Sequence, residues 1–405
     1  MGLAPYGEPK YADLILKEVV DLKEDGSFKI NMRYFSYCNG LRMINRKFEN
    51  LFGAPARKPE TQITQHYMDV AASIQQVTEE MMLKMARYAH RLSGQKYLCL
   101  AGGVALNCVG NGHILKEAGF EDIWIQPASG DAGGALGAAL SVWYQYSGNK
   151  RIADGKDKQK SSLLGPAYND TCIESFLKKE NIPYKKIEKA GIANMVSKLL
   201  AHGSVVGWFQ GRMEFGPRAL GSRSILGDPR NSQMQSRMNL KIKFRESFRP
   251  FAPSVMEEHA QEWFELGKKS PYMLLVADIK ENKRLPENAK DKALQGFDKL
   301  KAQRSVIPAV THVDYSARIQ TVSREDNPLF YELINAFYQK TGCPVVINTS
   351  FNVRGEPLVC TPLDAFRCFM RTDMDFLAIG SFILSKKEQK TTNQKIKQQE
   401  VLELD

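Results

Sequence analysis

The longest run of apolar residues at helical spacing covers residues 68–92. Apolar side chains recur there every three or four positions, which is the stripe of an amphipathic helix, and Ser93 with Gly94 marks its end. A stripe that contains several methionines at this spacing is typical of a buried helix face rather than of a functional surface. We therefore predict a core helix with the buried stripe Val70, Ile74, Val77, Met81, Met85, Tyr88 and Leu92.

Two strand-turn-helix units follow. Residues 97–101 predict a buried strand that leads into Gly102-Gly103 and a helix beginning near Ala105. Residues 123–127 predict a second strand, which leads into the glycine- and alanine-rich helix SGDAGGALGAAL. A strand, a glycine turn and a helix N-terminus together present backbone N–H groups to an anion. Gly102, Gly103 and Asn107 are therefore candidate nucleotide-binding residues, with simple chain reversal as the alternative for the glycine pair.

The pattern beyond this point predicts a further α/β region. Residues 148–162 lose hydrophobicity and gain charge, which indicates a linker. Residues 281–304 are charged and poor in hydrophobic residues, so we expect an exposed loop or helix there. Residues 385–405 are rich in lysine and glutamine and predict a disordered tail. Helices are predicted over 172–179, 192–200 and 329–340 and after Thr361-Pro362, and strands over 204–209, 310–322, 344–348 and 375–384.

Residues 207–253 combine cations with aromatic residues. The segment carries nine Arg or Lys residues against three Asp or Glu residues, a net charge of +6. Aromatic and aliphatic residues alternate with the cations and need burial, so we expect the cations to be held in place. Forked guanidinium groups on a rigid frame suit bidentate recognition of phosphate or carboxylate. The expected ligand is a compact anion.

Three of these cations are the strongest candidates for anion binding. Arg218 lies between Gly216-Pro217 and Gly221, and Lys243 and Arg249 lie in an aromatic run. The alternative is a solvated face or internal ion pairs, the usual fate of a charge run. We favour that alternative for five of the other cations, Arg212, Arg230, Arg237, Lys241 and Arg245.

Composition narrows the class of protein. A length of 405 residues allows two or three domains, and 43% hydrophobic with 25% charged residues is ordinary for a globular protein. The sequence has no apolar run of the ~20 residues that a membrane span needs, and its first residues lack the apolar core of a signal peptide, so we expect a cytoplasmic protein. The seven cysteines include no CxxC pair, which argues against a disulfide framework or a zinc site.

The net charge of +11 raises the question of nucleic-acid binding. The excess lies partly in residues 207–253 and partly in scattered lysines, and no RNA-binding module signature accompanies it. Small anionic substrates explain the central part equally well. Nucleic acid is therefore not the expected partner.

Four stretches carry a resemblance to a known family. These are MEFGPRALGSRSIL, NLKIKFRESFRPFAPSV, THVDYSARIQTV and VVINTSFNVRGEPLVCTP. Together they resemble the C-terminal domain of the carbamoyltransferase family, which includes the nodulation and antibiotic-tailoring O-carbamoyltransferases. Several long, separate motifs make such a match specific. The resemblance implies an α/β protein in which the C-terminal half of an actin-like, Kae1-like (ASKHA) domain precedes a YrdC-like domain.

The resemblance also implies a domain plan. We expect a partial Kae1-like domain over residues 1–150, a linker over 151–184, a YrdC-like domain over 185–385 and a polar tail over 386–405. The opening MGLAPYG resembles a motif that is normally internal to the family's N-terminal domain. The expectation is therefore a fragment, or a chain whose partner supplies the missing half-domain; a homodimer is left open.

Roles for individual residues follow from the resemblance as well. Arg318 resembles an anion ligand of the carbamoyl phosphate pocket, while Ser350 and Asn352 would orient the ligand through hydroxyl and amide groups. Asp131 lies in GDAGGALGAA, whose aspartate in this family joins a histidine pair on a divalent metal, iron or magnesium. By composition alone we favour a helix cap for Asp131. The six histidines form no HxxxH pair, so the implied metal site is incomplete.

The resemblance implies a carbamoyltransferase that uses carbamoyl phosphate and ATP. It would form carbamoyl adenylate, with Arg218, Lys243, Arg249 and Arg318 neutralising phosphate charge, and would then O-carbamoylate a hydroxyl of a sugar or natural product. Two alternatives stay open. One is a non-catalytic fragment that binds nucleotide and carbamoyl phosphate, and the other is an enzyme related to tRNA threonylcarbamoylation.

Overall fold

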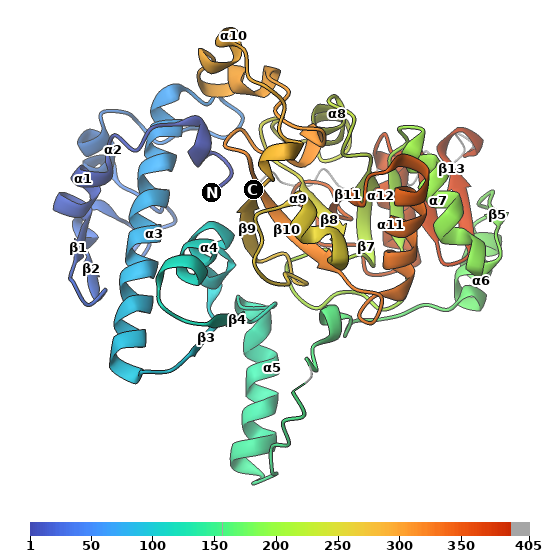
Figure 1. Cartoon of the computed structure of the whole chain (residues 1–405), viewed down its shortest axis with the longest axis horizontal. Coiled ribbons are helices and arrows are strands. Elements are labelled where there is room, and N and C mark those ends of the chain that lie inside the picture. The colour runs from blue at the N-terminus through green and yellow to red at the C-terminus, as the bar shows by residue number, and fades with distance from the viewer. Residues whose placement is uncertain (156, 390–405) are drawn as a thin grey trace. The chain divides into compact units, whose positions relative to one another are not determined.

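The computed structural model describes residues 1–155 and 157–389 and divides into two compact units. The first unit comprises residues 1–100, 107–124 and 287–302, and the second comprises 101–106, 125–286 and the chain from 303 onward. Figure 1 labels their helices and strands. Most of the predicted tail, from residue 390, lies outside the described residues. Within the part of the chain that the structure describes, no helix has both the length and the apolar character required to cross a membrane.

The first unit is built on the long helix α3, Gln65–Ser93. The predicted helix is confirmed, and Gly94 ends it in a left-handed conformation with φ +62°. The predicted stripe is only partly right. Val77 is fully buried, whereas Ile74, Met85 and Leu92 are exposed. The buried face also includes Met68, Ala72, Met82 and Ala86, because α4 (Cys108–Glu117) packs on α3 and adds a second contact surface.

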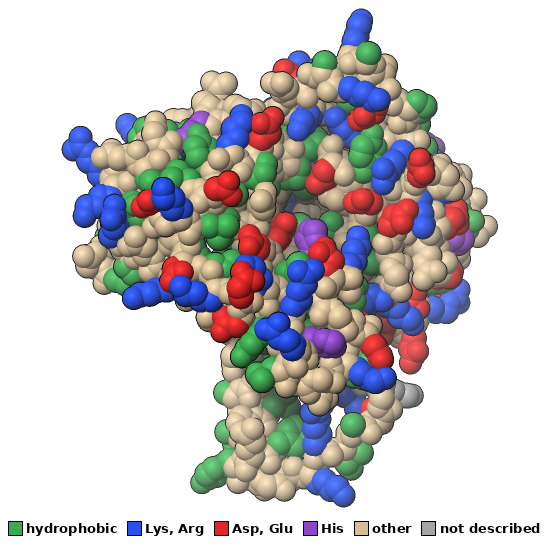
Figure 2. Space-filling view, turned by 60° about the vertical axis from the view of Figure 1, so that its left-hand side comes forward, with side chains coloured by type: hydrophobic (Ala, Val, Ile, Leu, Met, Phe, Trp, Pro, Cys, Tyr) green, Lys and Arg blue, Asp and Glu red, His purple; other side chains and the backbone are tan. Residues whose placement is uncertain are grey.

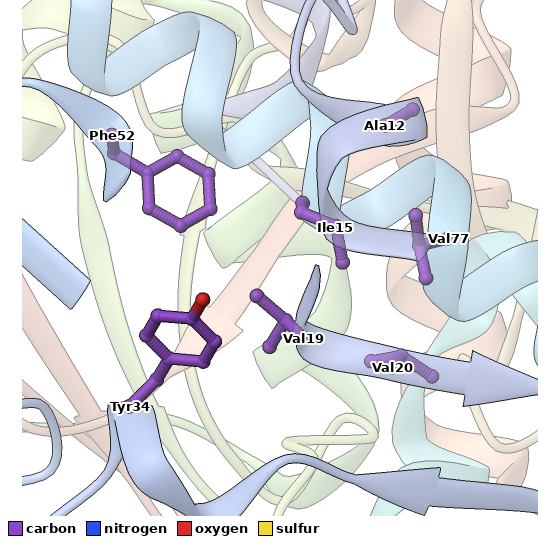
Figure 3. Packing of buried hydrophobic residues seen from close by; sticks show 7 residues of the cluster. All are labelled: Ala12, Ile15, Val19, Val20, Tyr34, Phe52 and Val77. Carbon is purple, nitrogen blue, oxygen red and sulfur yellow. The ribbon is translucent and has the colours of Figure 1, made fainter. Parts of the chain in front are cut away.

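A compact apolar cluster joins α3 to the N-terminal elements (Figure 3). Each large aliphatic or aromatic side chain removed from water contributes about 1.5–3 kcal/mol, so a cluster of this size stabilises the unit substantially. The Tyr34 hydroxyl donates to Glu18 at 3.0 Å, which satisfies its polar end. The cluster consists of Ala12, Ile15, Val19, Val20, Tyr34, Phe52 and Val77.

A segment far along the sequence completes the first unit. Residues 287–302 contain α10 (Ala289–Lys292) and η10 (Gly296–Lys301). The Phe297 ring lies edge-on to Tyr6, with centroids 5.2 Å apart, and Lys299 Nζ donates to the Pro5 carbonyl at 3.2 Å. The predicted exposed segment is confirmed for α10, while η10 packs against the chain's first turn.

Strand β3 (Tyr97–Leu100) pairs with β4 (Asp122–Ile125) in a two-stranded sheet. The prediction of a buried strand is wrong, because Tyr97 and Cys99 are exposed. A two-stranded sheet buries little of either face. The helix predicted from Ala105 is α4, which begins at Cys108; η4 (Gly103–Leu106) precedes it.

The second unit contains a nine-stranded mixed sheet of order β5-β13-β12-β6-β7-β11-β8-β10-β9. Strands β12 and β6, and β10 and β8, run parallel, and the other neighbours run antiparallel. The α/β class is confirmed. The strands are β5 Lys185–Lys186, β6 Val206–Phe209, β7 Arg223–Gly227, β8 Ala252–Met256, β9 Leu275–Asp278, β10 Ser316–Val322, β11 Val345–Ser350, β12 Phe376–Ile379 and β13 Phe382–Ser385.

Three strand predictions need correction. The strand predicted over 310–322 begins only at Ser316, and the helical turn η11 (Pro308–Val310) occupies its expected start. The single strand predicted over 375–384 is a hairpin of β12 and β13, because Gly380 adopts φ +53° and turns the chain. Strand β11 extends two residues beyond its predicted end, through Thr349 and Ser350, since these residues pair with Ile225 and Ser224 of β7. Ser350 therefore lies at the end of a strand rather than in a free loop.

The predicted helices of this unit are present with the expected caps. Helix α11 (Pro328–Thr341) begins at Asn327, whose side chain accepts from the Phe330 N–H, and ends at Gly342. Helix α12 (Pro362–Arg371) has a capping box between Thr361 and Asp364. Helices α7 and α11 pack against each other, and α12 packs on β6 and β12. The other helices are α5 Asp131–Ser141, α6 Asp170–Lys179, α7 Ile192–Ala201, α8 Met234–Lys241 and α9 Ala260–Trp263.

Candidate functional site

Lys243 lies two residues beyond α8 and reaches the end of strand β11. Its side chain is 4% exposed, and its Nζ contacts the carbonyl and hydroxyl oxygens of Ser350 at 2.9 and 3.1 Å. The carbonyl and side-chain oxygens of Asn352 lie 2.7 and 2.6 Å from the same nitrogen. The structure thus brings together three residues that were predicted from distant parts of the sequence. With four protein oxygens around its ammonium group, Lys243 holds the segment from Ser350 to Asn352 in place. A direct contact between Lys243 and phosphate stays a prediction.

The electrostatics of Lys243 reflect its burial. Removal from water, and then the nearby Arg245 charge, lower the pKa of the Lys243 ammonium to about 7. The four surrounding oxygens favour the charged form, because an ammonium can donate to them. A second link joins the two loops, since the Arg354 N–H donates to the Lys243 carbonyl at 3.3 Å.

Arg245 is half-buried beside Lys243. Its Nε donates to the Asn239 side chain at 2.7 Å, and its guanidinium lies 5.0 Å from the centre of the Phe251 ring. Burial, followed by the charges of Arg249 and Arg318, lowers the Arg245 pKa to about 10. A repulsion of this kind requires the Arg249 and Arg318 guanidinium groups each to lie near Arg245. Against the effect of burial, backbone hydrogen bonding and then the charges of Arg249 and Arg354 lower the pKa of Glu246, so the Arg354 charge lies in the same region. The basic cluster, defined here as Lys243, Arg245, Arg249, Arg318 and Arg354, contains two arginines that sequence reasoning did not select, Arg245 and Arg354.

Few negative charges balance this cluster. Arg249 pairs with Glu246 at 3.1 Å and remains partly exposed, and Glu356 pairs with Arg371 outside the cluster. The predicted ion-pair alternative is confirmed for Arg230, which pairs with Asp228, and for Arg237, which pairs with Asp375. Positive charge concentrated near the end of β11 is suited to binding a phosphorylated anion.

Phe244 gives the cluster an unusual backbone. It separates Lys243 from Arg245 and adopts φ +47°, the left-handed region that non-glycine residues rarely occupy. Conformations of this kind cost about 1–3 kcal/mol and persist where the surroundings impose them. The Lys243-Phe244-Arg245 triplet, in which an aromatic residue separates two cations, is the sequence signal that could have identified Arg245.

Arg218 lies in the 210–223 loop, the connection between β6 and β7. The buried Glu214 carboxylate closes this loop by accepting the N–H groups of Leu220 and Ser222, both at 2.8 Å, and of Arg223 at 3.2 Å. Gly221 adopts φ +102° and packs so tightly on Phe330 that an added Cβ would lie 2.2 Å from the ring. Arg218 itself donates to the Leu106 carbonyl at 3.3 Å. Its convergence with the basic cluster stays a prediction.

Arg223 anchors the far end of the same loop. Its guanidinium is fully buried, lies 3.6 Å from the centre of the Phe209 ring and donates to the carbonyls of Gln210 and Pro166 at 2.8 and 3.2 Å. Burial lowers its pKa to about 10. Sequence reasoning selected neither Glu214 nor Arg223, although the two residues flank the GPRALGS motif.

For the candidate nucleotide-binding residues Gly102, Gly103 and Asn107, the structure shows roles in a turn and a helix cap and does not identify a ligand. Gly102 and Gly103 are exposed at a turn, with φ +96° at Gly102. Asn107 caps α4 by accepting the Gly110 N–H at 3.2 Å and also contacts Gln75. Their role in nucleotide binding stays a prediction.

Asp131 is the first residue of α5 rather than its cap, and its side chain makes no capping hydrogen bond. The cap favoured from composition is therefore wrong, because Gly130 occupies that position. Across residues 1–155 and 157–389, no group of three His, Cys, Asp or Glu side chains is arranged to hold a metal ion. The described residues do not fit the metal site that the resemblance implies, and we derive no step through a metal.

Comparisons with known proteins match two long regions of the chain. A family model described as carbamoyltransferase N-terminus matches residues 1–140, and one described as carbamoyltransferase C-terminus matches residues 197–386. An uncharacterized protein of Synechocystis is 57% identical over 100% of this chain and 66% of its own length. Nodulation protein NolO of Bradyrhizobium diazoefficiens is 38% identical over 96% of this chain and 65% of its own length.

The chain spans about two thirds of the length of these curated relatives, and 52% of nodulation protein NolNO of Sinorhizobium fredii, to which it is 38% identical. A solved structure of full-length HypF in the phosphate- and nucleotide-bound form covers 49% of this chain and 21% of its own length, with a TM-score of 0.27 and 14% identity. That likeness is too low to support an inference about the fold.

Proposed function

Because the chain belongs to the carbamoyltransferase family, we propose that it takes part in carbamoyl transfer through its second unit. This unit would bind carbamoyl phosphate and ATP. Water would cleave the phosphate from carbamoyl phosphate, and the carbamate oxygen would displace pyrophosphate from the α-phosphorus of ATP to give carbamoyl adenylate. The adenylate would then serve to carbamoylate a hydroxyl group of a small acceptor such as a sugar or natural product.

The observation that carries the proposal is the basic cluster at the end of β11. Hydrogen bonds hold the buried Lys243 against Ser350 and Asn352. After burial, the charges of Arg249 and Arg318 lower the pKa of Arg245, so both lie near it. Preorganised cations of this kind stabilise phosphate charge that develops or moves during transfer. The Ser350 hydroxyl and the Asn352 amide can also bond to a carbamoyl group, since both offer donors and acceptors.

Each arginine has a distinct part in the proposal. Arg318 and Arg249 would neutralise the phosphate groups of the two substrates, and Arg245 would add charge from its half-buried position. Arg218 would contact carbamoyl phosphate from the 210–223 loop, whose shape Glu214 maintains. Positioning and charge neutralisation account for most catalysis of phosphoryl and nucleotidyl transfer, which is consistent with a site rich in arginine.

Arg218→Ala tests the assignment directly. We expect at least a hundredfold loss of carbamoyl phosphate-dependent exchange of pyrophosphate into ATP, because removal of one preorganised donor costs about 2.7–4 kcal/mol. Arg212→Ala is the matched control, since Arg212 is exposed in the same loop and donates to the Leu164 carbonyl. The control should retain exchange, and circular dichroism should show both variants folded.

The exchange assay, a binding measurement and a gel shift together separate the proposed enzyme from the two alternative functions. Normal exchange in Arg218→Ala would remove this residue from the site. Binding of ATP and carbamoyl phosphate by calorimetry without release of pyrophosphate would favour a non-catalytic binding protein. A shift of tRNA in a native gel would favour the threonylcarbamoylation-related alternative.

A further inference from the structure

The two residues that follow Arg218 are fastened to the large sheet through their backbone carbonyls. The Ala219 carbonyl accepts a hydrogen bond from Asn348 Nδ2 at 3.1 Å, and the Leu220 carbonyl accepts one from Gln320 Nε2 at 2.9 Å. The two amides also bond to each other, since Asn348 Nδ2 donates to Gln320 Oε1 at 2.9 Å. Both side chains are buried. Water cannot replace hydrogen bonds in such a place, so they hold the backbone after Arg218 in one position.

The next residue, Gly221, is held from the same sheet. Its carbonyl accepts the indole N–H of the buried Trp208 at 2.9 Å, and its own N–H donates to Ser224 Oγ at 3.2 Å. Ser254 Oγ donates to Gln320 Oε1 at 2.6 Å and thereby fixes the orientation of that amide. We define the polar network as the buried side chains Trp208, Ser224, Ser254, Gln320 and Asn348.

The polar network occupies one face of the sheet, and so do two predicted anion ligands. Its side chains come from β6, β7, β11, β8 and β10, which are neighbours in this order (Figure 1). Directly paired residues, and residues two apart on one strand, share a face. Ser350 pairs with Ser224 and lies two residues from Asn348. Arg318 lies two residues from Gln320, so Arg318 and Ser350 both stand on the face that carries the network.

Arg318 and Ser350 are displaced from the network toward the same end of the sheet. Strand β10 runs parallel to β8 and β11 runs antiparallel to it, so the steps from the two amides to Arg318 and Ser350 have the same direction. Each step covers about 7 Å, because residues in a strand rise about 3.3 Å each. The carbonyls that the two amides hold belong to the residues directly after Arg218. Arg218 therefore starts from backbone that lies beside the positions of Arg318 and Ser350.

We infer that the polar network is a positioning device that directs Arg218 toward the anion site of Arg318 and Ser350, with Gln320 and Asn348 acting on the substrate through Arg218. The inference rests on the proposed function only for the identity of the anion, carbamoyl phosphate. A guanidinium binds two oxygens of one phosphate only at a defined angle, so a fixed backbone sets its selectivity. Figure 2 shows Lys and Arg interspersed with Asp and Glu over the face in view, so surface charge there does not replace a fixed arginine.

Gln320→Met tests the device, because it replaces the amide by an apolar side chain of similar length. We expect kcat/KM for carbamoyl phosphate in the pyrophosphate exchange assay to fall by about tenfold or more, since small misplacements of a fixed group are costly. Thr321→Val is the matched control. Thr321 is buried on the other face of β10, where its hydroxyl accepts the Ser270 N–H at 2.9 Å. The control should retain the kcat/KM of the wild type.

A double-mutant cycle with Arg218→Ala separates positioning from a general effect on the fold. Once Arg218 is absent, Gln320→Met should change kcat/KM by less than about twofold, because the network then has no arginine to position. Losses of the two single variants that multiply in the double variant would overturn the inference.

Hydrogen exchange gives a readout that needs no substrate. Peptides covering residues 217–223 should exchange about tenfold faster in Gln320→Met than in the wild type, and at the wild-type rate in Thr321→Val. A wild type without pyrophosphate exchange activity would refute the proposed function. Unchanged hydrogen exchange in Gln320→Met would instead refute the inference, so the two failures are distinguishable.

Ser254→Ala is a milder variant that decides the matter if Gln320→Met does not fold. It deletes one donor to Gln320 and leaves the bond between Gln320 and the Leu220 carbonyl in place. We expect kcat/KM to fall by about threefold in the wild-type background and to stay constant in the Arg218→Ala background. Equal losses in the two backgrounds, or no loss in either, would contradict a role of the network in positioning Arg218.

Discussion

At the residue scale, Lys243 shows how burial and hydrogen bonding oppose each other in one group. Burial lowers its pKa to about 7, while four oxygens of Ser350 and Asn352 stabilise the ammonium. The lysine therefore ties the end of β11 to the segment after α8 and sets the geometry of the candidate site. The position of Arg245, two residues further along the chain, depends on the same contacts.

This balance predicts a pH dependence of stability. With a pKa near 7 when folded and 10.5 when unfolded, the unfolded chain binds more protons between these pH values, so stability rises with pH. From pH 7 to 9, the free energy of unfolding of the wild type should rise by about 2 kcal/mol relative to Lys243→Met. Urea unfolding at each pH measures it. Parallel curves for the two proteins would show that the four oxygens keep Lys243 charged at its ordinary pKa.

At the element scale, the 210–223 loop is a rigid unit rather than a flexible connection. Glu214 collects three backbone N–H groups, and Arg223 bonds to backbone carbonyls beneath the ring of Phe209. These two buried charged residues hold the turn that contains Arg218. Rigid placement is what lets a single arginine discriminate among anions.

Glu214→Ala should loosen this loop. The loss leaves buried N–H groups without acceptors and should lower the free energy of unfolding by at least about 2 kcal/mol. It should also raise the concentration of carbamoyl phosphate needed for half-maximal exchange, because Arg218 is no longer held. Glu214→Gln retains one acceptor oxygen and should recover part of both effects. Equal affinity for carbamoyl phosphate in wild type and Glu214→Ala would show that the loop does not position Arg218.

At the scale of the whole molecule, the chain does not follow a simple succession of domains. The first unit takes its last piece from residues 287–302, after most of the second unit has been built. Phe297 and Lys299 reach the turn at Pro5 and Tyr6, so a late segment stabilises the beginning of the chain. The predicted domain boundaries stay predictions.

Phe297→Ala should therefore affect the N-terminal turn. Loss of an edge-on aromatic pair costs about 0.5–1.5 kcal/mol beyond the buried area. Hydrogen exchange of peptides covering residues 1–20 should become faster, while peptides of β6 and β11 should not change. Lys301→Ala is the matched control in η10, because Lys301 is exposed and pairs only with Asp298 among the interactions described. Unchanged exchange at the N-terminus would contradict a role for η10 in the first unit.

The sequence by itself determined the features that depend on local chemistry. Helical spacing predicted α3, caps such as Thr361-Pro362 and Asn327-Pro328 located α12 and α11, and the density of arginine indicated an anion site. The long motifs identified the family. These signals are local because capping, helical periodicity and turn formation involve residues only a few positions apart.

Only the tertiary structure decided which distant residues meet. It joined Lys243 to Ser350 and Asn352, assigned Arg245 to the basic cluster and exposed the stripe residues Ile74 and Leu92. Contacts across a hundred residues follow from sheet order and register, and burial depends on which element packs on which face, so neither can be inferred from spacing along the chain.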